Sequence, residues 1–250
     1  MNNWLDDLRL AVAMLTRIPM PHPDGATPSY LARAQRVIAL VGAGIGAAIG
    51  LIYLGLLATG MPVLAAAALA LGAGALLTGA FHEDGLADLA DGFGGGRNKV
   101  AKLEIMRDSR LGTYGAFILL VTFVAKVAAL AALPKSSILM SLIAAHALSR
   151  GPLPALALTL PNARDDGLAA SSGKVDSAVA TIAAAIAVVI ALLCLPFPDA
   201  VLSTLIAIAA VIAIGVLARR QIGGYTGDVL GAAQQMAELA VLLLLAIRYG

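Results

Sequence analysis

Four acidic side chains, Glu83, Asp84, Asp88 and Asp91, lie in a segment that contains no lysine or arginine, residues 81–92. In a helix, which turns by about 100° per residue, Asp84, Asp88 and Asp91 share one face and Glu83 lies beside it. Carboxylates stacked on one face repel each other, and the repulsion grows where water is scarce. A bound divalent cation removes this conflict; the alternative interpretation is a solvated helix end.

Mg²⁺ is the cation that this pattern favours, because one or two carboxylates hold it while water and substrate phosphate complete its shell. We predict Asp84, Asp88 and Asp91 as its ligands. His82 comes just before these acids. It either contacts a bound ligand or is an interfacial residue.

Basic groups follow the acidic segment. A glycine-rich run at 92–96 precedes Arg97, and Arg107 and Arg110 flank an Asp-Ser pair shortly before the next apolar segment. Glycine N–H groups can approach an anion, and a guanidinium group binds phosphate through two hydrogen bonds. Otherwise the glycines form a flexible turn and the arginines anchor a helix end. Combined with a Mg²⁺-binding face, these groups are typical of phosphoryl transfer.

The composition shows what must position these groups. Hydrophobic residues make up 60% of the 250 residues and charged ones 13%, and the mean hydropathy is +0.91. Soluble domains average about 45–50% apolar and about 25% charged residues, so we predict an all-α polytopic membrane protein. The net charge of +2 gives no reason to expect a nucleic-acid partner. The single cysteine, Cys194, excludes an internal disulfide.

Apolar segments of about 18–20 residues can cross about 30 Å of hydrocarbon. Seven segments qualify: residues 37–57, 61–80, 114–133, 138–158, 178–195, 200–217 and 229–247. Before them, Trp4, Leu8, Ala11 and Leu15 recur at helical spacing, which predicts a short helix lying in the membrane interface or packed on the bundle. No second domain is indicated, so we treat residues 1–250 as one integral membrane domain.

The positions of lysine and arginine predict the orientation. With the N-terminus inside, 13 of the 17 basic residues fall in inside segments and two in outside segments, in agreement with the positive-inside rule. Segments 81–113, 159–177 and 218–228 should therefore face the cytoplasm. Segment 81–113, which contains the acids and arginines, is the predicted catalytic helical loop.

Ionisable residues at membrane depth indicate function by default. His146 and Arg150 are four residues apart in the fourth apolar segment, and we predict that both contact substrate. Glu238 lies midway along the last segment and Lys126 midway along the third. These two could instead form a structural ion pair.

Glycines indicate where helices approach each other closely. Gly42, Gly46 and Gly50 recur at every fourth position of the first span, which is typical of a helix-packing face. A second group of glycines, at 223–231, surrounds Asp228 and would let the last span approach the acidic helix. Asp228 either stabilises only the start of its own helix or shares a metal or substrate site with the acids.

Three motifs in this chain resemble the cobalamin synthase family. They are His-Glu-Asp-Gly-Leu-Ala-Asp with Ala-Asp-Gly at 82–92, Arg-Asp-Ser-Arg-Leu-Gly-Thr-Tyr-Gly at 107–115, and Gly-Tyr-Thr-Gly-Asp-Val-Leu-Gly-Ala at 224–232. The sequence Leu-Thr-Arg-Ile-Pro at 15–19 is similar to the start of that family, so the resemblance covers most of the chain in order. Leu89 departs from the threonine of many members, but it faces away from the acidic face.

Members of that family are adenosylcobinamide-GDP ribazoletransferases. The resemblance therefore implies a Mg²⁺-dependent enzyme of the bacterial or archaeal inner membrane, with its active site facing the cytoplasm. It would join adenosylcobinamide-GDP to α-ribazole, or to its 5′-phosphate, and release GMP.

The site residues can be assigned on that basis. The expected catalytic set is Glu83, Asp84, Asp88, Asp91 and Asp228, with Mg²⁺ on Asp84, Asp88 and Asp91 and with Glu83 or Asp228 taking the ribose hydroxyl proton. The expected substrate-binding set is His82, Arg97, Arg107, Arg110, His146 and Arg150. The expected partners are the two substrates and the lipid bilayer, and a homo-oligomer is left open.

Two other functions remain open at this point. A CDP-alcohol phosphotransferase-like lipid synthase uses the same metal chemistry, and Asp84-Gly85-Leu86-Ala87 matches the start of its motif, but Asp88 stands where that motif needs arginine. A cation transporter would use His146, Arg150 and Glu238 along its path. Transporters favour acids at the membrane midplane, whereas most acids here are predicted at the cytoplasmic edge.

Overall fold

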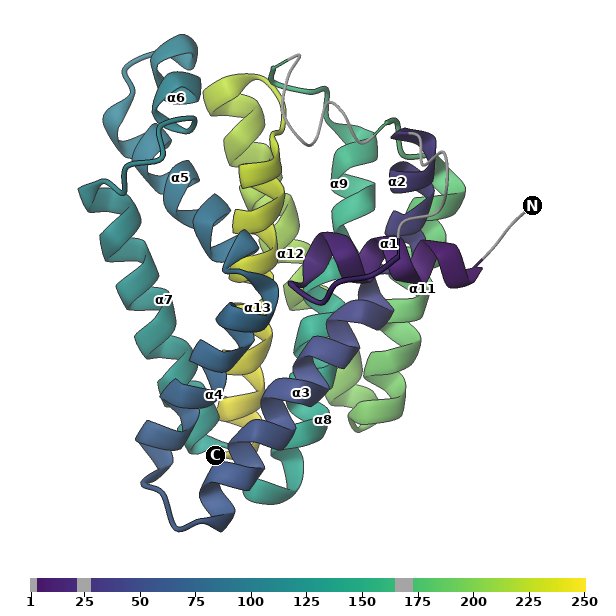
Figure 1. Ribbon diagram of the computed structural model, residues 1–250, viewed down its shortest axis with the longest axis vertical. Coiled ribbons are helices and arrows are strands. Elements are labelled where there is room, and N and C mark those ends of the chain that lie inside the picture. The colour runs from purple at the N-terminus through teal and green to yellow at the C-terminus, as the bar shows by residue number, and fades with distance from the viewer. Residues whose placement is uncertain (1–3, 22–27, 165–172) are drawn as a thin grey trace.

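A computed structural model describes residues 4–21, 28–164 and 173–250 and shows a bundle of helices (Figure 1). The described residues contain no strand; one isolated β-bridge pairs Asn162 with Tyr225. The prediction of an all-α polytopic membrane protein is therefore confirmed in its fold class. Residues 165–172, part of the predicted cytoplasmic segment 159–177, lie outside the described residues.

The helices occur in the following order along the chain. In the first half they are α1 (Trp4–Leu15), α2 (Pro28–Ala34), the short 3₁₀ helix η1 (Gln35–Val37), α3 (Ile38–Ala58), α4 (Val63–Thr78), α5 (Phe81–Gly95) and α6 (Lys99–Ile105). In the second half they are α7 (Thr113–Ala132), α8 (Lys135–Arg150), α9 (Leu153–Thr159), α11 (Ser177–Cys194), α12 (Phe197–Ile222) and α13 (Gly227–Tyr249).

Five helical segments of the described chain are long and apolar enough to cross a membrane: residues 28–58, which join α2, η1 and α3, and helices α7, α11, α12 and α13. The bent pair α4 and α5 raises the number to six if it is one span. The sequence predicted about seven. The difference lies at 138–158, where the chain forms α8 and then α9, separated by Gly151 and Pro152.

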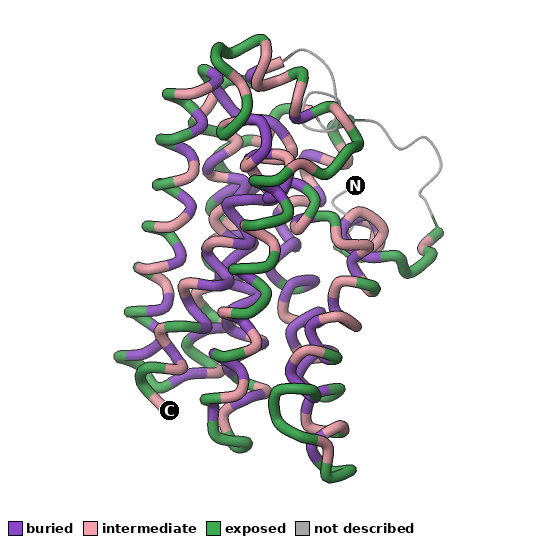
Figure 2. Tube along the Cα trace, turned by 90° about the vertical axis from the view of Figure 1, so that its left-hand side faces the viewer, coloured by how far each residue is buried: buried purple, intermediate pink, exposed green. Residues whose placement is uncertain are grey.

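Helix α8 is short, and it carries several polar residues. Its 16 residues include Ser141, His146, Ser149 and Arg150, all of which are buried. The helix lies inside the bundle, so its polar side chains face other helices instead of lipid. The outward faces of the other helices carry the apolar surface instead: Leu76, Leu193 and Ile247 are each 80% exposed, and Figure 2 shows exposed residues along the outside of the bundle.

The predicted cytoplasmic segments gather at one end of the bundle. In Figure 1, α6, the C-terminal end of α9 and the turn from α12 to α13 lie at the top. The turns after α3, α7 and α11 lie at the opposite end, together with the C-terminus. The two ends therefore separate the segments that the lysine and arginine positions assigned to the inside from those assigned to the outside.

The N-terminal helix α1 lies across the bundle instead of along it (Figure 1). It buries Leu10, Ala11 and Leu15 but leaves Trp4 and Leu8 exposed. The predicted helix is thus present and packs on the bundle through one face. Its place in the membrane interface stays a prediction.

The acidic helix α5 begins at a sharp bend. α4 and α5 meet at 92°, and Gly79 and Ala80 between them both have left-handed backbone, with φ of 66° and 55°. Left-handed backbone costs an L-residue such as Ala80 about 1–2 kcal/mol. The backbone N–H of Arg17 donates to the Leu77 carbonyl at 2.7 Å, and the Arg17 guanidinium fills the space beside Gly79. The chain that follows α1 therefore holds the bend in place.

Glycines bring α3 and α8 into close contact, as their spacing predicted. A Cβ added at Gly46 would collide with the Leu142 carbonyl, and one added at Gly42 with the His146 carbonyl. Backbone cannot move aside as a flexible side chain can. Any larger residue at these positions must therefore push the two helices apart.

We expect Gly46→Ala to destabilise the protein by about 1–3 kcal/mol, because the added methyl group separates α3 from α8. The measurement is the thermal unfolding midpoint in detergent. Gly44→Ala is the matched control, since it is on the same helix and a Cβ there meets nothing within 4 Å. The control should keep or raise the midpoint, because alanine favours a helix over glycine by about 1 kcal/mol. Equal midpoints for the two variants would contradict the packing argument.

Candidate functional site

The helices α5 and α13 cross in close contact, and this contact assembles the site. A Cβ on Gly85 would lie 3.0 Å from Asp228 Cα and 3.3 Å from Gly231 Cα. The glycines on both helices therefore permit the approach that the sequence predicted. As a result Asp228, in the first turn of α13, lies beside the acidic residues of α5.

The acids of α5 differ in exposure: Asp84 is exposed, Asp88 is half-buried and Asp91 is buried. The carboxylates of Asp84, Asp228 and Asp91 all lie close enough to Asp88 to repel its negative charge. Among the described residues, Asp84 and Asp88 form no side-chain hydrogen bond and no ion pair within 4 Å, and only the more distant Arg164 partly offsets the repulsion at Asp88. The pair is therefore available to a cation.

Asp228 is better compensated than the acids of α5. Its Oδ2 accepts a hydrogen bond from the Thr226 hydroxyl at 3.1 Å and lies 3.5 Å from an Arg164 guanidinium nitrogen. Thr226 also caps α13, since its hydroxyl accepts the Val229 N–H at 3.4 Å. The two hydrogen bonds of Thr226 fix the start of α13 and the orientation of the Asp228 carboxylate.

Asp91 binds backbone instead of pointing at its neighbours on the acidic face. One carboxylate oxygen accepts the Gly112 N–H at 2.8 Å and the other accepts the Gly115 N–H at 2.9 Å. Side chains on either glycine would collide with this carboxylate. Asp91 thus fastens the start of α7 to α5, a role that its spacing in the sequence did not reveal.

The three predicted metal ligands are therefore not assembled as one group. Within the described residues, no three His, Cys, Asp or Glu side chains converge closely enough to hold a metal ion by themselves. Asp84 and Asp88 remain as neighbours with Asp228 close by, while Asp91 is occupied by α7. Magnesium binding at this face stays a prediction.

The predicted phosphate-binding groups lie at the same end of the molecule. Arg97, Arg107 and Arg110 are exposed. Arg110 Nε donates to both carboxylate oxygens of Asp108 at 3.0 Å, and this hydrogen bonding lowers the pKa of the Asp108 carboxyl. Their binding of phosphate is untested.

The glycine-rich run differs from its expected form as a turn. α5 continues to Gly95, so most of the run is helical. A Cβ on Gly94 would lie 2.6 Å from the Tyr114 ring, and one on Gly92 would lie 2.5 Å from Met106 Cγ. The glycines therefore let Met106 and Tyr114 pack directly against α5. They do not form a flexible anion-binding loop.

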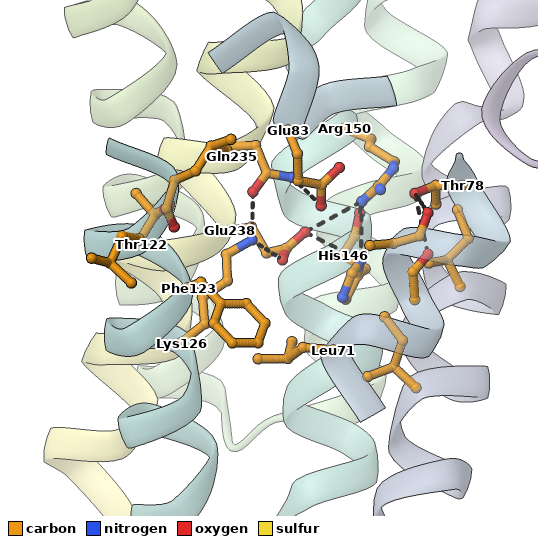
Figure 3. A pocket seen from close by; sticks show the side chains of 16 residues that line it. Leu71, Thr78, Glu83, Thr122, Phe123, Lys126, His146, Arg150, Gln235 and Glu238 are labelled. Carbon is orange, nitrogen blue, oxygen red and sulfur yellow. Dashed lines mark hydrogen bonds and ion pairs between the residues drawn. The ribbon is translucent and has the colours of Figure 1, made fainter. Parts of the chain in front are cut away.

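A second polar group lies deeper in the bundle, where Figure 3 shows several charged and amide side chains turned toward one another. Lys126 Nζ donates to Glu238 and to Gln235, each at 2.6 Å. Gln234 donates to the other Glu238 oxygen at 2.6 Å. The pair of Lys126 and Glu238 that the sequence left open is thus present.

The same Glu238 carboxylate connects α13 to α8. His146 Nδ1 lies 3.3 Å from Glu238 Oε2 and Arg150 Nη1 lies 3.7 Å from it. Gln235 Nε2 donates to Glu83 Oε1 at 3.1 Å, which links this group to α5. The sequence placed Glu83 beside the acidic face, but the structure turns it toward the buried group.

His82 is buried and is 3% exposed, so it is no surface residue of the interface. Its ring meets the Phe81 ring edge-on, with centroids 5.2 Å apart. Together with Arg150 and Tyr225 it lines a small cavity of about 80 Å³, and Arg150 also lines the larger cavity in Figure 3. His82 thus contacts neighbouring side chains within the fold, and its binding of substrate is untested.

The N–H groups of Gly112 and Gly115 donate to Asp91, and these two hydrogen bonds hold the start of α7 against α5. Replacing Asp91 should therefore loosen the start of α7. We expect Asp91→Asn to cost roughly 1–3 kcal/mol, because an amide nitrogen cannot accept an N–H. Hydrogen exchange at the Gly112 and Gly115 amides should accelerate. The exposed Asp108→Asn is the control and should leave both amides protected. Unchanged exchange in Asp91→Asn would show that the clamp is absent.

A second prediction follows from the buried ion pairs of Glu238. Glu238→Gln leaves Lys126 and Arg150 without their nearest carboxylate and should cost about 3–5 kcal/mol. Adding Lys126→Met should restore part of the lost stability, because the double variant no longer buries the positive charge of Lys126 without its carboxylate. Thermal unfolding of both variants in detergent measures this. A double variant less stable than Glu238→Gln alone would refute the pairing.

Comparisons with known proteins agree with one another. The model of the cobalamin-5-phosphate synthase family matches residues 7–246. The chain is 41% identical to adenosylcobinamide-GDP ribazoletransferase of Bradyrhizobium diazoefficiens, over 98% of this chain and 94% of that protein. It is 43% identical to the protein of the same name from Azorhizobium caulinodans, over 96% and 94% of the two chains. No solved structure matches the chain significantly.

Proposed function

The chain belongs to the cobalamin-5-phosphate synthase family, and we propose that it acts as an adenosylcobinamide-GDP ribazoletransferase. In this reaction a hydroxyl of α-ribazole, or of its 5′-phosphate, attacks the cobinamide-linked phosphorus of adenosylcobinamide-GDP. A new P–O bond forms, the diphosphate bond breaks, and GMP leaves. Family membership favours this function over the lipid synthase and the cation transporter that the sequence left open.

The observation that carries the site assignment is that Asp84 and Asp88 have no close ion-pair partner among the described residues. Each lies near other carboxylates. Two carboxylates are enough for Mg²⁺, because water and substrate phosphate supply its other ligands. We therefore assign Mg²⁺ to Asp84 and Asp88, with Asp228 beside them and Asp91 as a positioning residue. Bound Mg²⁺ would offset the negative charge that develops on the diphosphate and on the departing GMP.

The attacking hydroxyl must lose a proton to a nearby base. Of the two acids that the sequence offered, Asp228 already accepts a hydrogen bond from Thr226 and lies near Arg164. Glu83 keeps its Oε2 buried without a hydrogen-bond partner. We therefore favour Glu83 as the proton acceptor.

The remaining groups suit a soluble, anionic substrate. Arg97, Arg107 and Arg110 are exposed at the end of the bundle where α5 ends, and guanidinium groups there would hold the phosphate oxygens. The positive charges favour this end as the cytoplasmic one, in an inner membrane. Nucleotide substrate would then reach the acids directly from the cytoplasm.

The central test is substitution of the two free acids. We expect Asp84→Asn and Asp88→Asn each to reduce GMP release by at least about 10³-fold, since each removes a metal ligand. Both proteins should remain folded, because neither acid makes a hydrogen bond that the substitution breaks. The assay follows GMP release from adenosylcobinamide-GDP, α-ribazole and Mg²⁺ by purified protein.

Glu104→Gln is the matched control, because Glu104 is an exposed acid of α6 outside the acidic face. It should retain wild-type turnover. Chelation of Mg²⁺ should abolish wild-type turnover and added Mg²⁺ should restore it. Near-normal rates in either Asp→Asn variant, or turnover that survives chelation, would overturn the metal assignment.

A further inference from the structure

A cavity of about 360 Å³ lies beside the buried polar group and is bounded by α3, α4, α5, α7, α8 and α13 (Figure 3). Its walls are mostly apolar and include Ile49, Leu71, Leu119 and Phe123. Its polar lining is Glu83, Lys126, His146, Arg150, Gln235 and Glu238, with Thr78 and Thr122. Small-molecule sites commonly have this character, with volumes of about 300–1,000 Å³ and a few polar groups that fix orientation.

Three of these polar side chains have an atom without a partner. Glu83 Oε2, His146 Nε2 and Arg150 Nε are buried and make no hydrogen bond within the described residues. Leaving such an atom unsatisfied costs roughly 1–3 kcal/mol, and three together in one cavity wall need an explanation. A ligand that both donates and accepts hydrogen bonds would supply the missing partners.

Charge limits what that ligand can be. The cavity lining contains two carboxylates, Glu83 and Glu238, and two cations, Lys126 and Arg150, so the charges are balanced. An ion entering this buried, balanced group would lack a counter-charge, and desolvation would oppose it. The cavity is therefore suited to a neutral molecule with an apolar body and several hydroxyl groups.

We infer that this cavity is the subsite for the ribazole nucleoside, an inference that rests on the function proposed above. The fused aromatic base would pack against Leu71, Leu119 and Phe123. The ribose hydroxyls would reach the unpartnered atoms of Glu83, His146 and Arg150.

The position of Glu83 joins this subsite to the acids. Glu83 and Asp84 are consecutive in α5, so the cavity and the acidic face lie on different sides of the same helical turn. A ribose held at Glu83 would lie within one turn of the acids assigned to the diphosphate. The much larger corrinoid nucleotide would stay at the acidic end, outside the cavity.

Ala75 provides a way to fill the cavity without touching a charged group. It is a half-buried residue of α4 that lines the cavity. We expect Ala75→Phe to weaken binding of α-ribazole by at least about tenfold, measured by equilibrium dialysis of the purified protein. It should raise the KM for α-ribazole by a similar factor and change the KM for adenosylcobinamide-GDP by less than about twofold.

Ala65→Phe is the control, because Ala65 is an exposed residue on the same helix outside the cavity. It should alter neither KM. If Ala75→Phe changes both KM values equally, or neither, the subsite assignment fails while the transferase function stands. If the wild-type protein binds α-ribazole but releases no GMP, the transferase function fails while the subsite stands.

A smaller substitution tests the same cavity if Ala75→Phe does not fold. Cys194 is the single cysteine, so Ala75→Cys in a Cys194→Ala background can be labelled selectively with N-ethylmaleimide. Added α-ribazole should slow that labelling several-fold, and labelling of Ala65→Cys in the same background should be unaffected. Labelling slowed by phospholipid but not by α-ribazole would assign the cavity to a lipid chain and overturn the inference.

Discussion

The close crossing of α5 and α13 at Gly85 and Gly231 is the contact on which the rest of the site depends. Because neither glycine carries a side chain, the two backbones approach until Gly85 lies against Asp228. The same crossing brings Gln235 to Glu83, one turn further along α13. A single packing contact therefore places one acid of α13 beside the acidic face of α5 and links that face to the buried polar group.

Ionic interactions inside the bundle are costly to assemble, and their arrangement shows how the cost is limited. Glu238 has Lys126, His146 and Arg150 around it, so the carboxylate is well compensated within the described residues. Asp84 and Asp88 lack such partners. Replacing a buried ion pair by apolar residues is often neutral or stabilising, so stability alone does not explain the Glu238 group. Its atoms without hydrogen-bond partners belong to side chains that line a cavity, which favours a role in binding.

The family relationship and the geometry contribute different parts of the conclusion. Sequence comparison with relatives at about 41–43% identity assigns the family across nearly the whole chain. The geometry separates acids that look equivalent in the motif: Asp91 fastens the start of α7 through Gly112 and Gly115, whereas Asp88 has no such partner. Since all of these acids share one motif, their identity in the sequence carries no information about which of them bind backbone.

The sequence alone determined the helical membrane class, the glycine packing face of the first span and the acidic segment at 81–92, because each depends on local spacing or composition; that α8 is the partner of the glycine face came from the structure. The sequence did not show that the segment 138–158 forms two helices, α8 and α9, or that the polar residues of α8 face neighbouring helices. Tertiary structure decided the role of Asp91, the direction of Glu83 and the cavity beside Glu238. Each of these joins residues more than 20 positions apart, and helical periodicity relates only residues within one helix.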